Sequence, residues 1–186
     1  MSTTPIHWLK SALVSTTLAF AISGCAAKTD TPVANESAAT ANVFAGTYLF
    51  DARDPHSEFG KAHPQEVKRY SSTFNALLAG RVKLERTFVS RITSGPSTQG
   101  EVLDIDGQKS VVHVTCQSHR CDIERMGLYY SPVSNQMGAL IWSHCEETIL
   151  GSPSATALAT LRRVAKLPEP TAQDIARCKK VSAAYE

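Results

Sequence analysis

Residues 111–142 have the sequence VVHVTCQSHRCDIERMGLYYSPVSNQMGALIW, which predicts three β-strands and two short connections. Residues 111–115 are mostly β-branched and alternate, as expected of a strand with one buried face. The apolar stretches at 123–130 and 137–142 predict two further strands. Residues 132–135 contain the proline, serine and asparagine that are typical of a turn. Strands joined by such short connections pair in antiparallel order.

A fourth predicted strand precedes this stretch and ends in a turn. Val102 and Asp104 alternate with apolar neighbours, and Asp106-Gly107 follows. We interpret Asp104 and Asp106 as strand and turn residues rather than as a catalytic pair of carboxylates, because an aspartate beside a glycine is typical of a tight turn. The four strands together predict an antiparallel meander.

Helical patterns flank the predicted strands. Apolar residues recur at three- and four-residue steps between Pro64 and Gly80, and more weakly before Ser94-Gly95-Pro96. The same spacing follows Pro153 and Thr171. The side chains of Thr171 and Asp174 resemble a helix cap. The apolar positions are Val67, Tyr70, Phe74, Leu77 and Leu78; Leu84, Phe88, Val89 and Ile92; Ala155, Leu158, Leu161 and Val164; and Ile175, Cys178 and Val181. The order of helix, strands and helices predicts an α+β fold, an antiparallel sheet flanked by helices.

The first 24 residues predict an export signal. Lys10 is the only charged residue in this segment, and an uncharged apolar run over residues 11–22 follows it. That run is too short to span a bilayer comfortably. We therefore expect residues 1–24 to be removed from an exported protein.

Cys25 is the expected site of lipidation. It follows Ile22-Ser23-Gly24, and a branched apolar residue with two small residues before cysteine resembles a bacterial lipobox. Acyl chains such as palmitate on Cys25 would anchor the protein to a membrane without spanning it. Because Ala26 rather than aspartate follows, we expect the periplasmic side of the outer membrane. An ordinary signal peptide with an incidental cysteine is the alternative.

Composition sets the remaining boundaries. Residues 25–46 are rich in alanine, threonine, serine and asparagine and have no apolar period, so they predict a flexible tether. We therefore expect one globular domain over residues 47–186. With 42% hydrophobic and 19% charged residues, the chain is neither intrinsically disordered nor a polytopic membrane protein. A formal net charge of +2 provides no electrostatic reason to expect nucleic-acid binding.

Four cysteines remain besides Cys25, and an even number in an exported chain predicts two disulfides. Three pairings of Cys116, Cys121, Cys145 and Cys178 are open, and we favour Cys116 with Cys121 and Cys145 with Cys178. The first pair closes a loop too short to gain much chain entropy, so its expected use is to shape the four residues between them. The second would tie the sheet to the last helix.

The segment Cys116-Gln117-Ser118-His119-Arg120-Cys121 resembles the signature loop of the Ivy family, the inhibitors of vertebrate lysozyme, whose pattern is Cys-Lys-Pro-His-Asp-Cys. Ser134-Asn135-Gln136-Met137 is similar to a second segment of that family at a matching distance. Phe74-Asn75 lies where the family has Phe-Asn in its first helix. The resemblance covers residues 67–165.

The resemblance implies a protruding, disulfide-closed loop and inhibition of C-type lysozyme rather than an enzymatic activity. In the family, the loop histidine enters the active-site cleft and hydrogen-bonds the catalytic carboxylates. Carried over to this sequence, that role falls to His119, with Gln117, Ser118 and Arg120 as further target-binding residues. The resemblance implies no cofactor.

Three of the four residues between the cysteines depart from the family pattern. Ser118 replaces proline, which makes the loop less rigid. Arg120 replaces aspartate, and a cation there either pairs with the carboxylates of a target cleft or is repelled by the basic rim of animal lysozymes. The bacterium's own lytic transglycosylases, which also use cleft carboxyl groups, are the alternative target. A non-inhibitory envelope lipoprotein is a further alternative, and a homodimer is a further candidate association.

Other site types receive little support. Cys116, Cys121, His113 and His119 are candidates for a metal site, but four residues separate the cysteines where two are usual, and exported thiols oxidise. The sequence contains no nucleophile elbow, P-loop or HExxH motif. We therefore predict no metal, no cofactor and no enzymatic activity.

Overall fold

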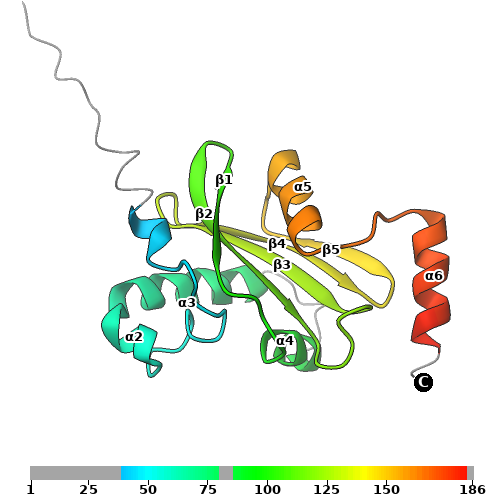
Figure 1. Ribbon diagram of the computed structural model, residues 1–186, viewed down its shortest axis with the longest axis horizontal. Coiled ribbons are helices and arrows are strands. Elements are labelled where there is room, and N and C mark those ends of the chain that lie inside the picture. The colour runs from blue at the N-terminus through cyan, green and yellow to red at the C-terminus, as the bar shows by residue number, and fades with distance from the viewer. Residues whose placement is uncertain (1–38, 80–85, 184–186) are drawn as a thin grey trace, which may run out of the picture. The chain divides into compact units, whose positions relative to one another are not determined.

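The structure is a computed structural model that describes residues 39–79 and 86–183, with only the backbone for residues 86–89. Five strands form one antiparallel sheet in which each strand pairs with the next along the chain (Figure 1). The strands are β1 (Glu101–Ile105), β2 (Gln108–Cys116), β3 (Arg125–Ser131), β4 (Gln136–Ser143) and β5 (Glu146–Leu150). The predicted α+β meander is therefore confirmed.

The predicted turn after the first strand is a two-residue hairpin loop. Asp106 and Gly107 have φ angles of 53° and 75° and join β1 to β2. Two positive φ angles in succession are typical of a type I′ turn, for which Asp-Gly is a preferred sequence. Asp106 thus has the turn role expected from the sequence.

Strand β5 was not predicted. It is joined to β4 by another two-residue loop, His144-Cys145, whose φ angles of 52° and 62° are again both positive. Histidine is among the residues found more often at positive φ, but cysteine is not, and the pair is not one of the glycine-containing pairs preferred in such loops. The usual sequence signal for a hairpin is therefore missing at this position.

The sheet separates two hydrophobic layers. Alternate residues of the central strands face helices α2 (Glu58–Ala62), α3 (Pro64–Ala79) and α4 (Arg86–Thr93), and the intervening residues face α5 (Ala155–Val164) and α6 (Ala172–Ser182). Met126, Leu128 and Tyr130 of β3 belong to the first layer, and Tyr129 to the second. Because both faces are covered, β3 and β4 have the continuous apolar sequences noted above.

The helices α3, α5 and α6 lie where the apolar periods predicted them. Ser154 caps α5 by accepting a hydrogen bond from the amide of Ala157, and Thr171 caps α6 through the amide of Asp174. The weaker pattern before Ser94 corresponds to α4, while the short α2 was not predicted. Gly80, expected to end α3, lies outside the described residues.

The folded part begins before the expected boundary at residue 47. Ala41 is fully buried and Phe44 is 1% exposed, with the Phe44 ring 5.2 Å from that of Tyr70 and 5.8 Å from that of Tyr130. An aromatic ring in the core stabilises the fold far more than a tether residue would. The export signal, Cys25 and the tether up to residue 38 lie outside the described residues. Over residues 39–79 and 86–183, no helix has the length and apolar character needed to cross a membrane.

Candidate functional site

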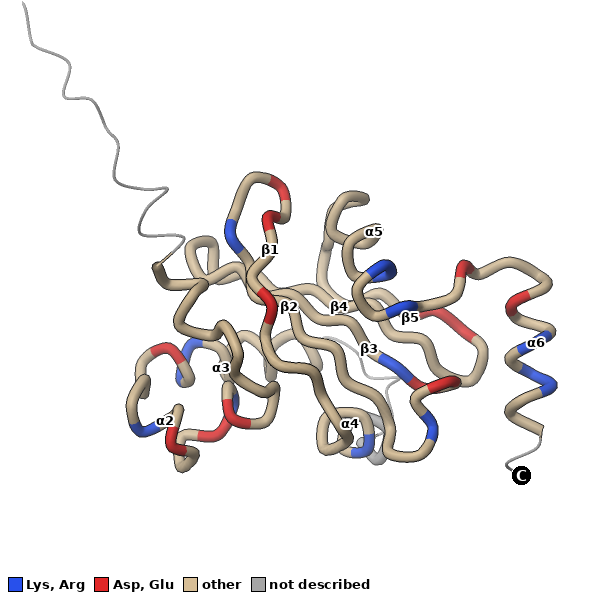
Figure 2. Tube along the Cα trace, viewed as in Figure 1, with Lys and Arg blue, Asp and Glu red and all other residues tan. Residues whose placement is uncertain are grey.

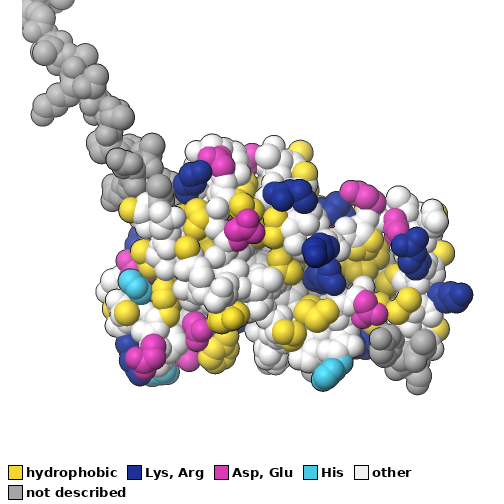
Figure 3. Space-filling model, viewed as in Figure 1, with side chains coloured by type: hydrophobic (Ala, Val, Ile, Leu, Met, Phe, Trp, Pro, Cys, Tyr) yellow, Lys and Arg dark blue, Asp and Glu magenta, His cyan; other side chains and the backbone are white. Residues whose placement is uncertain are grey.

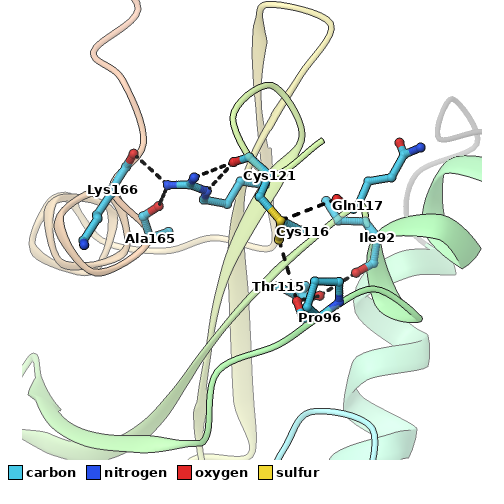
Figure 4. The surroundings of a disulfide bond; sticks show 9 residues. Ile92, Pro96, Thr115, Cys116, Gln117, Cys121, Ala165 and Lys166 are labelled. Carbon is cyan, nitrogen blue, oxygen red and sulfur yellow. Dashed lines mark hydrogen bonds between the residues drawn. A yellow bond between two sulfur atoms is a disulfide. The ribbon is translucent and has the colours of Figure 1, made fainter. Parts of the chain in front are cut away.

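The candidate site is the connection between β2 and β3. A disulfide joins Cys116, the last residue of β2, to Cys121, with their Cα atoms 4.9 Å apart (Figure 4). A second disulfide joins Cys145 to Cys178, so the structure has the pairing that we favoured. The first bond closes a ring around Gln117, Ser118, His119 and Arg120.

Within that ring the backbone forms a tight turn. The amide of Arg120 donates to the carbonyl of Gln117 at 3.0 Å, and His119, the third residue of the turn, has a φ angle of 64°. A positive φ at the third position is typical of a type II turn, where glycine or asparagine is preferred. Ser118 and His119 are exposed, whereas Gln117 and Arg120 are half-buried. The imidazole therefore lies at the tip of the loop.

A second turn returns the chain to β3. The amides of Ile123 and Glu124 both donate to the carbonyl of Arg120, at 3.1 and 2.8 Å, and the amide of Gln117 donates to the carbonyl of Glu124 at 3.2 Å. Strand β3 consequently begins at Arg125, two residues later than predicted. Main-chain hydrogen bonds thus close the loop independently of the disulfide.

One side of the loop base is attached to the segment after α4. The hydroxyl of Thr115 donates to the carbonyl of Ile92 at 2.6 Å, and the amide of Cys116 donates to the carbonyl of Pro96 at 3.2 Å (Figure 4). Thr115 is almost fully buried, so its hydroxyl needs this acceptor. The base is therefore immobilised on that side by a buried contact.

The other side of the base is attached to the second hydrophobic layer. Ile123 is 3% exposed and packs in the layer that contains Trp142. The carboxylate of Glu124 is buried too, and it accepts a hydrogen bond from the hydroxyl of Ser143 at 3.4 Å, with the His144 imidazole 3.7 Å away. Both residues lie buried at the base of the loop, so they support its tip and are not available to contact a target.

Histidine 113 does not belong to this site. It is 1% exposed, and its ring packs edge-on against the ring of Tyr70 at a centroid distance of 5.9 Å. Burial lowers the pKa of His113 to about 4, against a smaller opposing effect of the Thr98 backbone. His113 therefore stays neutral at pH 7. Within the described ranges, no group of three or more His, Cys, Asp or Glu residues is arranged to hold a metal ion.

The second segment of the family resemblance is also remote from the loop. Asn135 lies in the turn between β3 and β4, at the opposite end of β3. Its side-chain oxygen accepts hydrogen bonds from the hydroxyl of Thr73 at 2.9 Å and from that of Tyr130 at 3.0 Å. Asn135 thus attaches this turn to α3, and Phe74 beside Thr73 is fully buried in the core.

Positive charge is concentrated in the helices on one side of the sheet. Residues 155–183 contain six basic and two acidic residues, whereas the rest of the chain contains 13 and 15. Figure 2 shows the basic positions along α5 and α6, and in Figure 3 Lys and Arg side chains gather over these two helices. The carbonyls of Ala165 and Lys166, at the end of α5, lie near Cys121 (Figure 4). The loop base thus adjoins the cationic part of the surface.

Residues 69–178 match the family model described as inhibitor of vertebrate lysozyme (Ivy). The match covers 110 of the 186 residues and includes all five strands, the loop and both disulfides. No curated protein and no solved structure matches the chain.

Proposed function

The chain belongs to the Ivy family of inhibitors of vertebrate lysozyme, and on that premise we propose that its Cys116–Cys121 loop enters the active-site cleft of a C-type lysozyme with His119 at the tip. Family membership by itself implies lysozyme inhibition in general. The observation that supports the loop mechanism is the exposed His119 on a turn whose base is immobilised from two sides.

An imidazole suits such a cleft. A retaining glycosidase keeps its two carboxyl groups about 5–5.5 Å apart. The imidazole ring carries a nitrogen on each side, and both nitrogens donate when the ring is protonated. One ring can therefore bond both carboxyl groups, which leaves no room for the sugar or the attacking water.

The immobilised turn contributes to affinity through its order. A loop that must become rigid on binding loses conformational entropy, and the cost is about 0.5–1.5 kcal/mol for each immobilised side chain. The disulfide, the main-chain hydrogen bonds and the Thr115 contact order the loop before binding, so less conformational entropy is lost when the target binds. We assign direct contact with the target to His119 and Ser118, which are exposed, and the shape of the turn to the half-buried Gln117 and Arg120.

The bacterium's own lytic transglycosylases are the second candidate target. The excess of positive charge over residues 155–183 and the cation at Arg120 favour a target whose surface is less basic than that of animal lysozymes. Such an inhibitor would limit autolysis instead of defending the cell wall. The loop mechanism is the same for both targets.

We further propose that lipidation of Cys25 holds the protein at the periplasmic side of the outer membrane, beside the peptidoglycan that lysozyme attacks. Metabolic labelling with a palmitate analogue and membrane fractionation test this. Labelling and membrane association are expected for the full chain and not for Cys25→Ser. A labelled Cys25→Ser variant would overturn the assignment of the lipidation site.

An inhibition assay tests the loop mechanism. The full chain is titrated against C-type, G-type and I-type lysozymes and a lytic transglycosylase, with His119→Ala and the matched control His56→Ala, which removes another exposed imidazole far along the chain. His119→Ala is expected to weaken inhibition by about 1–3 kcal/mol, which is about 5- to 150-fold, and His56→Ala to leave it unchanged. Equal inhibition by wild type and His119→Ala would exclude His119 as the inhibiting group.

A further inference from the structure

Arg125 contacts both ends of the loop disulfide. Its backbone is paired with that of Cys116 in the register of β2 and β3, and its guanidinium donates from Nε to the carbonyl of Cys121 at 2.8 Å. A second donor, Nη2, is directed at the same carbonyl. A single side chain therefore joins the start of β3 to the residue that closes the loop.

The third nitrogen of the Arg125 guanidinium, Nη1, donates to carbonyls at the end of α5. Its Nη1 lies 2.8 Å from the carbonyl oxygen of Ala165 and 3.2 Å from that of Lys166 (Figure 4). Among the described residues no carboxylate forms an ion pair with Arg125. All of the acceptors are main-chain carbonyls, and those of Ala165 and Lys166 belong to a segment about 40 residues further along the chain than Arg125.

The end of α5 is built to present these carbonyls. The amide of Leu167 donates to the carbonyl of Arg162 and that of Lys166 to Arg163, while Lys166 has a φ angle of 50°. This is the hydrogen-bond pattern of a Schellman motif, with lysine in place of the usual glycine. The motif satisfies earlier carbonyls of the helix and leaves those of Ala165 and Lys166 for another donor. A cation there also interacts favourably with the helix dipole.

We propose that Arg125 is the positioning residue of the inhibitory loop, which it holds against the end of α5 so that His119 is presented in one orientation. This inference rests on the proposed function of the loop. Arg125 itself is half-buried at the base and need not touch the target. Its effect on a target is transmitted through Cys121.

The geometry requires arginine rather than any cation. The guanidinium has five donors in a planar fork and serves three carbonyls at once, whereas the lysine ammonium is a compact group on a flexible stem. In Arg125→Lys one or more of the carbonyls of Cys121, Ala165 and Lys166 would lose its donor. In Arg125→Met all three would.

Hydrogen exchange in the full chain measures the order of the loop without any target. The amides of Arg120, Ile123 and Glu124 report it, because all three donate to carbonyls within the loop. We expect them to exchange about tenfold faster in Arg125→Met, and less so in Arg125→Lys, with amides in the centre of β3 and β4 unchanged. Arg163→Met is the matched control, since it removes an exposed cation of α5 whose side chain has no hydrogen bond or ion pair with the described residues.

Inhibition of the muramidase that the wild type inhibits best is the second measurement. Arg125→Met is expected to weaken it about tenfold, with Arg125→Lys intermediate and Arg163→Met unchanged. In a Cys116→Ser, Cys121→Ser background, Arg125→Met should cause a smaller loss, because both features order the same loop.

The outcomes separate this inference from the proposed function. Unchanged exchange of the loop amides in Arg125→Met would overturn the positioning role, whatever the assay shows. Faster exchange with unchanged inhibition would show that loop order does not matter for binding and would overturn it as well. If the wild type inhibits no muramidase, the proposed function fails while the exchange data still decide whether Arg125 orders the loop.

Discussion

Gly95 lies directly against the carbonyl group of Cys116. A Cβ atom built on Gly95 would be 1.8 Å from that carbonyl oxygen, and the oxygen belongs to the main chain at the base of the loop. No side chain fits at position 95 unless the backbone of the loop base moves. The connection after α4 therefore fits closely against the disulfide-bearing end of β2.

The first prediction concerns this contact. Gly95→Ala should displace Cys116 and weaken the hydrogen bond from its amide to Pro96, with a loss of about 1–3 kcal/mol in the free energy of unfolding. Urea denaturation measures the loss. Gly46→Ala is a suitable comparison for substitution of glycine, because nothing lies near its Cβ position although its φ angle is 76°. A stability loss at Gly95 no larger than that at Gly46 would contradict the close fit.

The second prediction compares the effects of removing each disulfide on stability and on inhibition. In the chain-entropy view, a bond that closes 33 residues stabilises the fold by about 4 kcal/mol and one that closes five residues by about 2 kcal/mol. Replacing Cys145 and Cys178 by serine should therefore cost more stability than replacing Cys116 and Cys121. Inhibition should respond in the opposite order, since only the bond between Cys116 and Cys121 shapes the turn that carries His119. Thermal unfolding and inhibition assays on both double variants check this, and the same order in both assays would refute it.

The third prediction is a pH dependence of stability. Burial holds the pKa of His113 at about 4 in the folded protein, below the ordinary value of 6.5 that applies when the chain is unfolded. Between these values the unfolded state binds more protons, so folding stability is highest above pH 6.5 and falls as the pH decreases towards 4. The loss from His113 over this range is about 3 kcal/mol.

The variant His113→Leu isolates that contribution. Its stability should change less with pH between 7 and 4 than that of the wild type, as measured by urea denaturation at a series of pH values. The matched control is His56→Ala, which removes an exposed imidazole instead of a buried one. Parallel slopes for His113→Leu and the wild type would exclude His113 as the source.

The fourth prediction separates the fold from the site. Asn135→Ala should destabilise the protein by about 1–3 kcal/mol, because the hydroxyl of Tyr130 loses the Asn135 acceptor, that of Thr73 keeps only the carbonyl of Arg69, and Asn135 has a φ angle of 51°. Asn135→Gly keeps the backbone conformation and loses only the hydrogen bonds, so it should be less harmful. Neither should change the inhibition constant of the folded protein. A change in inhibition without a change in stability would place Asn135 at the target instead.

The strands and helices that were predicted share strong local signals. The apolar period of Tyr70 and Phe74, the cap at Thr171, and the Asp106-Gly107 turn all depend on neighbours within a few residues. Strand β5 was missed because its turn, His144-Cys145, contains neither glycine nor asparagine. A disulfide joins Cys145 to α6, 33 residues away, and this pairing, although favoured from the cysteine count, gave no indication of a turn at Cys145.

The candidate site was predicted in the same partial way. His119 and its two flanking cysteines could be identified because they lie within six residues and form a recognisable pattern. The residues that hold the loop base could not, since Ile92, Gly95 and Pro96 lie on another segment, and Arg125, although only four residues after Cys121, acts through carbonyls at the end of α5. The only hint in the sequence was Glu124-Arg125, two charged residues at the start of an otherwise apolar strand.

The sequence by itself determined the α+β meander, the cysteine-framed loop and the histidine within it, because these depend on periodicity and short spacing along the chain. The tertiary structure alone decided that His113 is buried while His119 is exposed, and that Phe44 belongs to the core. It also decided that the carbonyls of Ala165 and Lys166 meet the loop through Arg125. Burial and contact between distant segments arise only when the sheet and both helical layers pack together, and no local pattern encodes them.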